Sequence, residues 1–399
     1  MNVVGIVCEY NPFHSGHEYL IKKIRESLGA DSTVVCVMSG DFVQRGEAAV
    51  FSKYARAEAS CRCGADLVVE LPLPWALSSA EGFASGAVGL LSALGVSHLC
   101  FGSETGELQS LEAVARCIME DDFQPEVKTL LEEDASLSYA MARQRALERR
   151  LGSMARLIAL PNNILAVEYL KAIYAQQLQM KPLTFLREGA GHDTIGGVGF
   201  RSAADIRRML SQGLDIAPAV PAAAYPVFDR EIKQGRTRRD DETLEVAILS
   251  RLRMFTADYY AQLPDTADGA GQRLHRAARE EPGMDAVVAA ARTKRYSMSR
   301  IRRMCLCAAL GVTKDMSQGL PPYARVLAAN ERGCALLRDE ENKLSIPVIS
   351  KPASVRDLDQ RAQRVFAVGA AAHDLFALAY TAQTERKGGN DWRIGPKIV

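Results

Sequence analysis

The residues with the clearest chemical signature lie near the start of the chain, where residues 5–17 read GIVCEYNPFHSGH. A short apolar run leads into a loop, and the loop leads into a helical pattern. Ser15 and Glu18 have the spacing of a capping box, which predicts that the helix begins at Gly16. The free N–H groups and the positive dipole end of such a helix start suit a phosphate group.

Two histidines, His14 and His17, bracket Gly16 in this segment. Gly16 has no side chain, so phosphate oxygens can approach the backbone, and the imidazoles can donate hydrogen bonds to the same oxygens. Hydrogen bonds to a charged group contribute about 1.5–3 kcal/mol each. The alternative is a capped helix that carries two surface histidines. Because the chain has only six histidines and two of them flank this glycine, the pattern favours a phosphate site.

The elements that must position this loop alternate between strand and helix. Apolar, β-branched runs predict five strands, at residues 3–8, 33–38, 66–70, 97–101 and 182–186. Helical patterns lie between the early strands, at residues 16–28, 53–63, 80–94 and 107–119. The alternation predicts an α/β fold with a doubly wound, parallel five-stranded sheet, Rossmann-like in its βαβ units. Ligands of such sheets bind beyond the carboxyl ends of the strands.

The chain divides into two predicted domains. Residues 1–215 contain the sheet, with a helical insertion at about 120–178, and residues 216–399 are predicted to be mainly helical. Helices are expected in the second part at residues 241–260, 271–279, 285–291 and 299–310. A proline- and alanine-rich stretch at 217–226 is typical of the connection between the two parts.

The composition is that of an ordinary globular protein. The 399 residues include 49 Lys and Arg against 48 Asp and Glu, a formal charge of +1, which excludes a uniformly basic nucleic-acid coat. No apolar run approaches the ~18 residues of a membrane helix, so no membrane partner is predicted. Nine cysteines without a C-x-x-C pair predict reduced thiols and no metal site. The first residues lack the basic region of a signal peptide, so a cytoplasmic location is predicted.

Further segments show a family resemblance. H-x-G-H in this context resembles the nucleotidyltransferase superfamily, and a larger set of motifs resembles the bacterial tRNA(Met) cytidine acetate ligase family. These motifs are MSGDFVQRGE at 38–47, FGSE at 101–104, PNNILAVEYL at 161–170, REGAGHD at 187–193, KRYSMSRIRR at 294–303 and PYARVL at 322–327. The resemblance covers most of the chain.

The resemblance implies an ATP-dependent ligase. Acetate and ATP form acetyl-adenylate with Mg²⁺, and the exocyclic amine of the wobble cytidine of elongator tRNA(Met) then takes the acetyl group. Residues 1–215 would be the nucleotidyltransferase-like, ATP-binding catalytic domain, with His14 and His17 as catalytic residues. The implied ATP-binding residues are Val7, Cys8, Glu9, Tyr10, Asn11, Pro12, Phe13, His14, Ser15, Gly16, His17, Glu18, Tyr19, Leu20, Gly102, Asn162 and Arg187.

Other polar residues follow strands and could face the same cleft. Asp41, Gln44 and Arg45 come after the second strand and are candidates for the substrate side, although Asp41 is also a common turn residue. His192 and Asp193 could position phosphate or acetate, or form a structural pair.

One motif departs from the superfamily. Many members have a second phosphate motif that is rich in Ser and Thr and ends in Ile-Arg at a helix start. Residues 202–207 read SAADIR here, so Ser202 and Arg207 are kept, but alanine stands at the next two positions, where the motif has hydroxyl side chains. This puts phosphate contact from that loop in doubt and leaves Ser202 a role as a helix cap.

A basic cluster predicts the RNA-binding face of the second domain. Arg300 and Arg303 would share one face of a helix at i, i+3, and Tyr296 could stack on a base. The alternative is a solvated basic helix end. The predicted tRNA-binding residues are Arg292, Lys294, Arg295, Tyr296, Arg300, Arg302 and Arg303.

Two rival functions remain beside the ligase. One is a small-molecule adenylyltransferase of cofactor biosynthesis, which needs little beyond the sheet domain. The other is a non-catalytic tRNA-binding protein that keeps the nucleotide fold as a scaffold.

Overall fold

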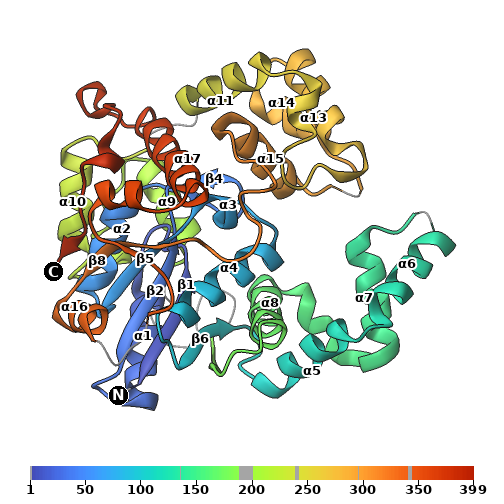
Figure 1. The fold of residues 1–399 in the computed structure, drawn as a ribbon, viewed down its shortest axis with the longest axis horizontal. Coiled ribbons are helices and arrows are strands. Elements are labelled where there is room, and N and C mark those ends of the chain that lie inside the picture. Colours follow the sequence, from blue (N-terminus) through green and yellow to red (C-terminus); the bar gives the residue numbers. More distant parts are fainter. Residues whose placement is uncertain (1, 135, 188–200, 239–241, 295, 340–343) are drawn as a thin grey trace.

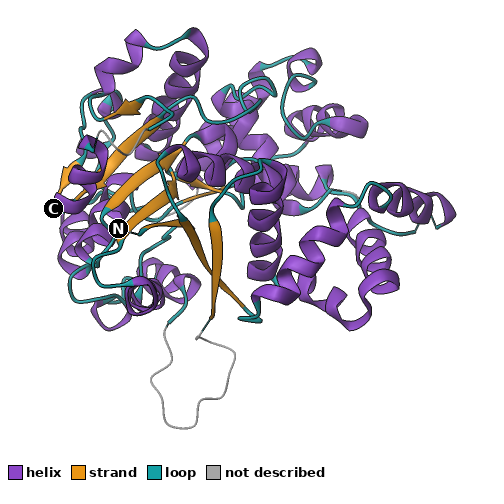
Figure 2. Cartoon of the chain, turned by 60° about the horizontal axis from the view of Figure 1, so that its bottom comes forward, coloured by secondary structure: helices purple, strands orange, loops and turns teal. Residues whose placement is uncertain are grey.

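The computed structural model describes residues 2–134, 136–187, 201–238, 242–294, 296–339 and 344–399. His192, Asp193 and Arg295 of the predicted site residues lie outside these ranges. Figure 2 shows the strands crossing the middle of the molecule with helices on both sides.

Five parallel strands form the central part of the sheet, which confirms the predicted α/β fold. Their order is β5-β2-β1-β6-β7, and each neighbouring pair is parallel. Their bounds are β1 Val3–Cys8, β2 Thr33–Ser39, β5 Leu67–Leu71, β6 His98–Ser103 and β7 Lys181–Leu186. The chain runs outward from β1 in both directions, so the carboxyl end of β1 lies at the topological switch point.

The sheet is larger than the five predicted strands. β8 (Ala324–Ala329) pairs antiparallel with β5, and β9 (Val348–Ile349) and β10 (Lys397–Ile398) each pair parallel with β8. Every residue of β8 is buried. A short apolar run of this kind has no periodicity that separates a buried strand from a helix, so the pattern did not reveal it. By pairing with β5, β8 also covers a strand edge that would otherwise be open.

Both faces of the sheet are covered by apolar clusters. Along β2, Val35 and Val37 belong to one cluster, and Val34, Cys36 and Met38 belong to the other. Burial on both faces is typical of parallel sheets with helices on each side.

The helices of the first part match the predicted ones closely. They are α1 Ser15–Leu28, α2 Lys53–Arg62, α4 Ala80–Ala93 and α5 Leu108–Met119, and the short helix α3 Leu73–Ala76 has no predicted counterpart. Ser52 and Ser79 cap α2 and α4 by accepting a backbone N–H, as serine commonly does at helix starts. A small hairpin of β3 (Phe42–Val43) and β4 (Glu47–Ala48) follows β2.

The segment predicted as a helical insertion lies between α5 and β7. It contains α6 Phe123–Glu133, α7 Tyr139–Leu151, η1 Gly152–Ala159 and α8 Pro161–Ala175. Helix α8 packs on α4 and α5, while α6 and α7 project from the body of the molecule on the right of Figure 1.

The second part contains a helical bundle and then returns to the sheet. The bundle, at the top of Figure 1, comprises α11 Glu242–Met254, α12 Ala257–Tyr260, α13 Ala270–Glu280, α14 Met284–Ala291 and α15 Met298–Leu310, close to the predicted helices. The other elements are α9 Ala203–Ser211, η2 Ala217–Ala219, α10 Tyr225–Lys233, η3 Ala267–Gly269, α16 Glu331–Arg338, η4 Pro352–Asp357, α17 Gln360–Ala377, η5 Gln383–Glu385 and η6 Asn390–Trp392. None of the helices in the described ranges has the length and apolar character to cross a membrane.

Candidate active site

The loop between β1 and α1 is closed by its two histidines. Nδ1 of His14 accepts from the Gly16 N–H at 3.1 Å, and Nδ1 of His17 accepts from the His14 N–H at 3.2 Å. His14 is therefore the N-cap and α1 begins at Ser15. The predicted capping box of Ser15 and Glu18 is wrong, because the imidazoles take the capping positions one residue earlier.

This arrangement fixes the proton on each imidazole. Since both Nδ1 atoms accept hydrogen bonds, each neutral ring carries its hydrogen on Nε2. The two rings contact each other with their centroids 3.7 Å apart and their planes tilted by 30°. Burial, together with the charge of Arg187, lowers the pKa of His14 to about 4. Burial, then the charges of His14 and Arg187, lowers the pKa of His17 well below its usual value. Both residues are thus neutral Nε2–H donors at pH 7.

Two aromatic side chains pack against the imidazole of His17. Tyr10 and Phe13 are buried, and their ring centroids lie 4.7 and 5.5 Å from that of His17. The Tyr10 hydroxyl lies 3.4 Å from Sγ of Cys36 on β2. These two predicted ATP-binding residues therefore position the imidazole with their side chains.

Two arginines hold the backbone of the same loop. Arg207 donates to the Asn11 carbonyl at 2.7 Å, and the fully buried Arg56 donates to the carbonyls of Glu9 and Gly40. Arg56 thereby joins the loops that follow β1 and β2. Sequence reasoning missed Arg56, which is one basic residue within a predicted helix. Ser202 caps α9 in a capping box with Asp205, which confirms its role as a cap.

Three of the predicted ATP-binding residues lie on β6, directly after β7 and at the start of α8. Gly102 lies in β6, and Arg187 follows β7, the next strand; a Cβ atom on Gly102 would lie 2.9 Å from Cγ of Arg187. Asn162 lies in the first turn of α8 and is hydrogen-bonded to Glu104, two residues beyond Gly102. These residues and the histidines share the carboxyl edge of β1, β6 and β7.

The residues predicted for the substrate side separate into different environments. Arg45 is exposed, and the Gln44 N–H donates to Oε1 of Glu9 at 2.8 Å. Burial raises the pKa of Glu9 above its usual value. Asp41 is buried instead: Oδ1 accepts from the Lys53 N–H, and Oδ2 lies 2.8 Å from Nδ1 of His373. Asp41 thus points into the protein interior and away from the predicted cleft.

A buried charged network adjoins Asp41 and was missed by sequence reasoning. Nζ of Lys53 lies 2.8 Å from Glu70 and 2.6 Å from Asp391, and Arg325 lies 2.6 Å from Asp391. Lys53 and Asp391 are 338 positions apart, so no spacing pattern could have paired them.

The predicted RNA-binding face is in large part engaged within the protein. Tyr296 is only 5% exposed and Arg303 only 6%, so neither offers an open surface. Arg303 donates to the Gln44 carbonyl, Arg302 pairs with Glu47 at 2.8 Å, and Arg300 donates to the Asp265 carbonyl. Burial removes Tyr296 as an open stacking surface and Arg303 as an open cation, because the hairpin after β2 and the loop before α13 pack onto α15. Arg300 and Arg302 are partly exposed, and their predicted contact with RNA stays a prediction. Arg292 and Lys294 are exposed.

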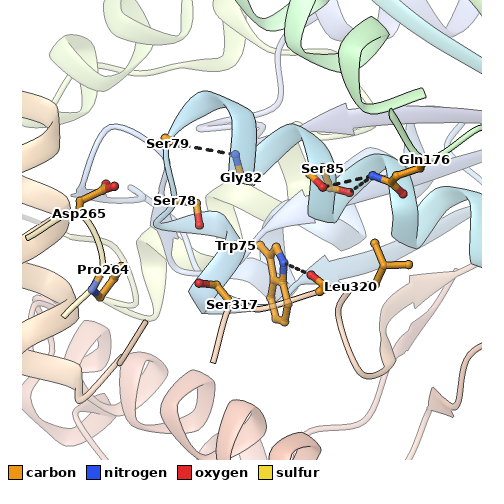
Figure 3. Close-up of a pocket in the computed structure, with 11 residues that line it drawn as sticks. Trp75, Ser78, Ser79, Gly82, Ser85, Gln176, Pro264, Asp265, Ser317 and Leu320 are labelled. Carbon is orange, nitrogen blue, oxygen red and sulfur yellow. Dashed lines mark hydrogen bonds between the residues drawn. The ribbon is translucent and has the colours of Figure 1, made fainter. Parts of the chain in front are cut away.

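A cavity of about 490 Å³ lies between α4 and the helical bundle (Figure 3). Nε1 of Trp75 donates to the Gly319 carbonyl at its floor, and Gln176 donates to Ser85 at its side. The lining residues are Trp75, Ser78, Ser79, Gly82, Ser85, Gln176, Pro264, Asp265, Ser317, Gly319 and Leu320. This lining contains an aspartate and no lysine or arginine, so it does not suit a phosphate.

Together, the sheet and the loop define a class of protein. The family model described as HIGH Nucleotidyl Transferase matches residues 1–391. Thirty-five per cent identity over 98% of both chains relates this protein to the tRNA(Met) cytidine acetate ligase of Acetivibrio thermocellus. The relative of the same name from Syntrophotalea carbinolica is 37% identical over 88% of this chain and 85% of its own. The chain belongs to the tRNA(Met) cytidine acetate ligase family, a family of enzymes.

Solved structures agree with this assignment. The chain superposes on Thermotoga maritima TmcAL in its apo form with a TM-score of 0.91, at 30% identity and over all of both chains. The same protein bound with alpha-thio ATP gives a TM-score of 0.90.

Proposed function

We propose that the protein activates acetate with ATP and transfers the acetyl group to the exocyclic amine of the wobble cytidine of elongator tRNA(Met). A carboxylate oxygen of acetate attacks the α-phosphorus, the bond from that phosphorus to the bridging oxygen breaks, and pyrophosphate leaves. The cytidine amine then attacks the acetyl carbon, AMP leaves and the amine loses a proton. A tRNA substrate implies a cytoplasmic enzyme.

The observation that carries this proposal is the pair of neutral imidazoles at the switch point of the sheet. Acetate is already a nucleophile, so the first step needs alignment and stabilisation of phosphate charge more than a strong base. His14 and His17 each have an Nε2–H to donate, because both Nδ1 atoms are engaged in capping α1. The guanidinium of Arg187 lies close enough to depress the pKa of both rings and can bind the same phosphates.

Mg²⁺ would bind through the nucleotide. The described residues contain no group of three or more His, Cys, Asp or Glu side chains that could hold a metal ion. Mg²⁺ commonly binds phosphate oxygens and keeps several waters. When bound in this way, it would neutralise charge on the departing pyrophosphate.

The two parts of the chain would divide the work. We propose that residues 1–215 form the adenylate and that residues 216–399 bind tRNA. The exposed Arg292 and Lys294 support the second role, because exposed cations bind backbone phosphates.

The test is a reaction with purified protein, ATP, radiolabelled acetate and tRNA(Met), followed by mass spectrometry of the nucleosides. Acetylated cytidine is expected only when all components are present. Pyrophosphate release with a mononucleotide acceptor and no tRNA would favour the small-molecule adenylyltransferase. Tight tRNA binding without any ATP-dependent product would favour a non-catalytic binding protein.

A further inference from the structure

The carboxylate of Glu104 occupies the start of α8. The N-cap residue of this helix, Leu160, provides no side-chain hydrogen bond. Glu104, from the loop after β6, accepts from the backbone N–H of Asn162 at 3.1 Å and of Asn163 at 2.8 Å. In return, Oδ1 of Asn163 accepts from the Glu104 N–H at 2.9 Å. These reciprocal hydrogen bonds connect the loop after β6 to the first turn of α8 and fix the position of the Glu104 carboxylate.

A further hydrogen bond orients the side chain of Asn162. Its Nδ2 lies 2.6 Å from Oε1 of Glu104. A carboxylate oxygen can only accept a hydrogen bond, so the NH₂ end of the amide must face Glu104. The carbonyl Oδ1 then points to the other side, and within the described ranges it has no hydrogen-bond partner. Since Asn162 is only half-buried, this oxygen is a fixed acceptor that a ligand can reach.

The position of this acceptor suits the base of a nucleotide. Glu104 lies two residues beyond Gly102, where the backbone approaches Arg187 closely. Arg187, which lies against Gly102 of β6, also acts on the pKa of His14 and His17, so the β6 side of β1 adjoins the histidine loop. We therefore place the nucleoside of a nucleotide bound at this loop on the β6 side. The 6-amino group of adenine is a donor that Oδ1 can accept, whereas the 6-keto oxygen of hypoxanthine or guanine would be repelled.

We propose that Glu104 is a positioning residue that fixes the Asn162 amide with its oxygen toward the nucleotide, so that the site selects a 6-aminopurine over a 6-ketopurine. The proposal rests on the proposed function, since it assumes that ATP binds beside the H-x-G-H loop. It assigns base selectivity to a pair of side chains at the start of α8.

The test compares the dissociation constants of ATP and ITP by titration calorimetry, because ITP replaces the amino group by a keto oxygen. Wild-type protein should bind ATP at least about tenfold more tightly than ITP. Glu104→Ala frees the amide to rotate and should bring the ratio close to one. Glu104→Asp shortens the side chain but keeps its charge at the helix start, and should give an intermediate ratio even if the alanine variant folds poorly.

Two further variants complete the design. Asn162→Ala should remove the preference to the same extent as Glu104→Ala, and the double variant should lose nothing more, because the two residues act as one unit. Glu107→Ala, the matched control, removes an exposed carboxylate nearby and should leave the ratio unchanged.

The outcomes separate this proposal from the proposed function. If Glu104→Ala weakens ATP and ITP by the same factor, Glu104 has a structural role only and the proposal is overturned. Equal affinity of the wild type for ATP and ITP also overturns it, while ATP-dependent acetylation still stands. No ATP binding by the wild type would overturn the proposed function itself.

Discussion

At the scale of single residues, His14 combines a structural role with a chemical one. Its Nδ1 caps α1 by accepting from the Gly16 N–H, and this leaves the hydrogen on Nε2 for a ligand. Asparagine is also a good N-cap and can accept through Oδ1, but it has no donor at the position of Nε2. Substitutions at position 14 can therefore separate helix stability from phosphate binding.

We expect His14→Asn to keep the stability of the protein and lose activity. Its free energy of unfolding should stay within about 0.5 kcal/mol of the wild type, whereas His14→Ala, which loses the cap, should lose about 1 kcal/mol. Both variants should slow ATP–pyrophosphate exchange in the presence of acetate by about 10²-fold or more. Urea unfolding and the exchange assay measure the two effects. Full exchange activity in His14→Asn would contradict a role for Nε2.

The protonation of the two histidines can be measured directly. In the folded protein the pKa of His14 is lowered to about 4, and that of His17 is lowered as well. Their imidazole NMR resonances should thus keep neutral shifts when the pH falls from 8 to about 5, with His14→Asn and His17→Asn providing the assignments. The unfolded chain takes up protons near pH 6.5, so these groups reduce stability as the pH falls below that value. Titration of both rings near pH 6.5 would contradict their burial.

At this scale the sequence predicted only those features that depend on residues close together in the chain. GIVCEYNPFHSGH predicted the succession of strand, loop and helix because the three lie within thirteen residues. It gave the wrong cap, because a serine at position 15 is a commoner N-cap than a histidine at 14. The burial of Asp41, Tyr296 and Arg303 depends on distant elements that no local pattern contains.

At the scale of elements, the hairpin of β3 and β4 links the sheet to the helical bundle. Gln44 donates to Glu9 of the H-x-G-H loop on one side and accepts from Arg303 of α15 on the other. Gly46, at the turn of the hairpin, has a φ of +77°, and a Cβ atom there would lie 2.6 Å from the backbone nitrogen of Arg303. Only glycine allows this close approach.

We expect Gly46→Ala to disturb the docking of α15 on the hairpin. The methyl group would meet helix backbone, which cannot move aside like a flexible side chain. Acetyl transfer to tRNA should fall about tenfold or more, while ATP–pyrophosphate exchange should change less if, as we propose, the first part of the chain carries it. Parallel assays of the two half-reactions provide the measurement.

Gly269→Ala is the matched control for this substitution. Gly269 also has a positive φ, +82°, but a Cβ atom there would meet nothing within 4 Å. It should therefore show the backbone strain, about 1 kcal/mol, without the loss of transfer. Equal effects of the two substitutions on transfer would mean that the contact with α15 is unimportant.

Prediction of the elements succeeded where the pattern was regular and failed where pairing was remote. The five parallel strands and the helices between them follow from short apolar runs and amphipathic stretches in βαβ spacing. β8 was not predicted because its partner β5 lies more than 250 residues earlier in the chain. The hairpin was not predicted because its strands have two residues each. β10 was not predicted as a strand because it also has only two residues.

At the scale of the whole molecule, the segment around Asp391 packs against the sheet and helices of the first part of the chain. Asp391 in η6 is fully buried and bonds to Lys53 on α2, Arg325 on β8 and the hydroxyl of Tyr54. Burial alone would raise the pKa of Asp391, but the charges of Lys53 and Arg325 outweigh it, and its pKa lies below the usual value. The carboxylate thus compensates two buried cations from elements that are distant in sequence.

We expect Asp391→Asn to destabilise the protein by about 3 kcal/mol, because the buried Lys53 and Arg325 must then share the carboxylate of Glu70 as their counter-charge. Asp357→Asn, which removes an exposed carboxylate in the same region of the sequence, should change the free energy of unfolding by less than about 0.5 kcal/mol. Urea unfolding at pH 7 measures both.

The contribution of Asp391 to the free energy of unfolding should also depend on pH. Because the folded state depresses the pKa of Asp391, this contribution is complete above the unfolded pKa of about 4 and is lost progressively as the pH falls below that value toward the folded pKa. The difference between wild type and Asp391→Asn should therefore shrink toward acid pH. A difference that stays constant down to pH 3 would mean that the loss came from packing and not from charge.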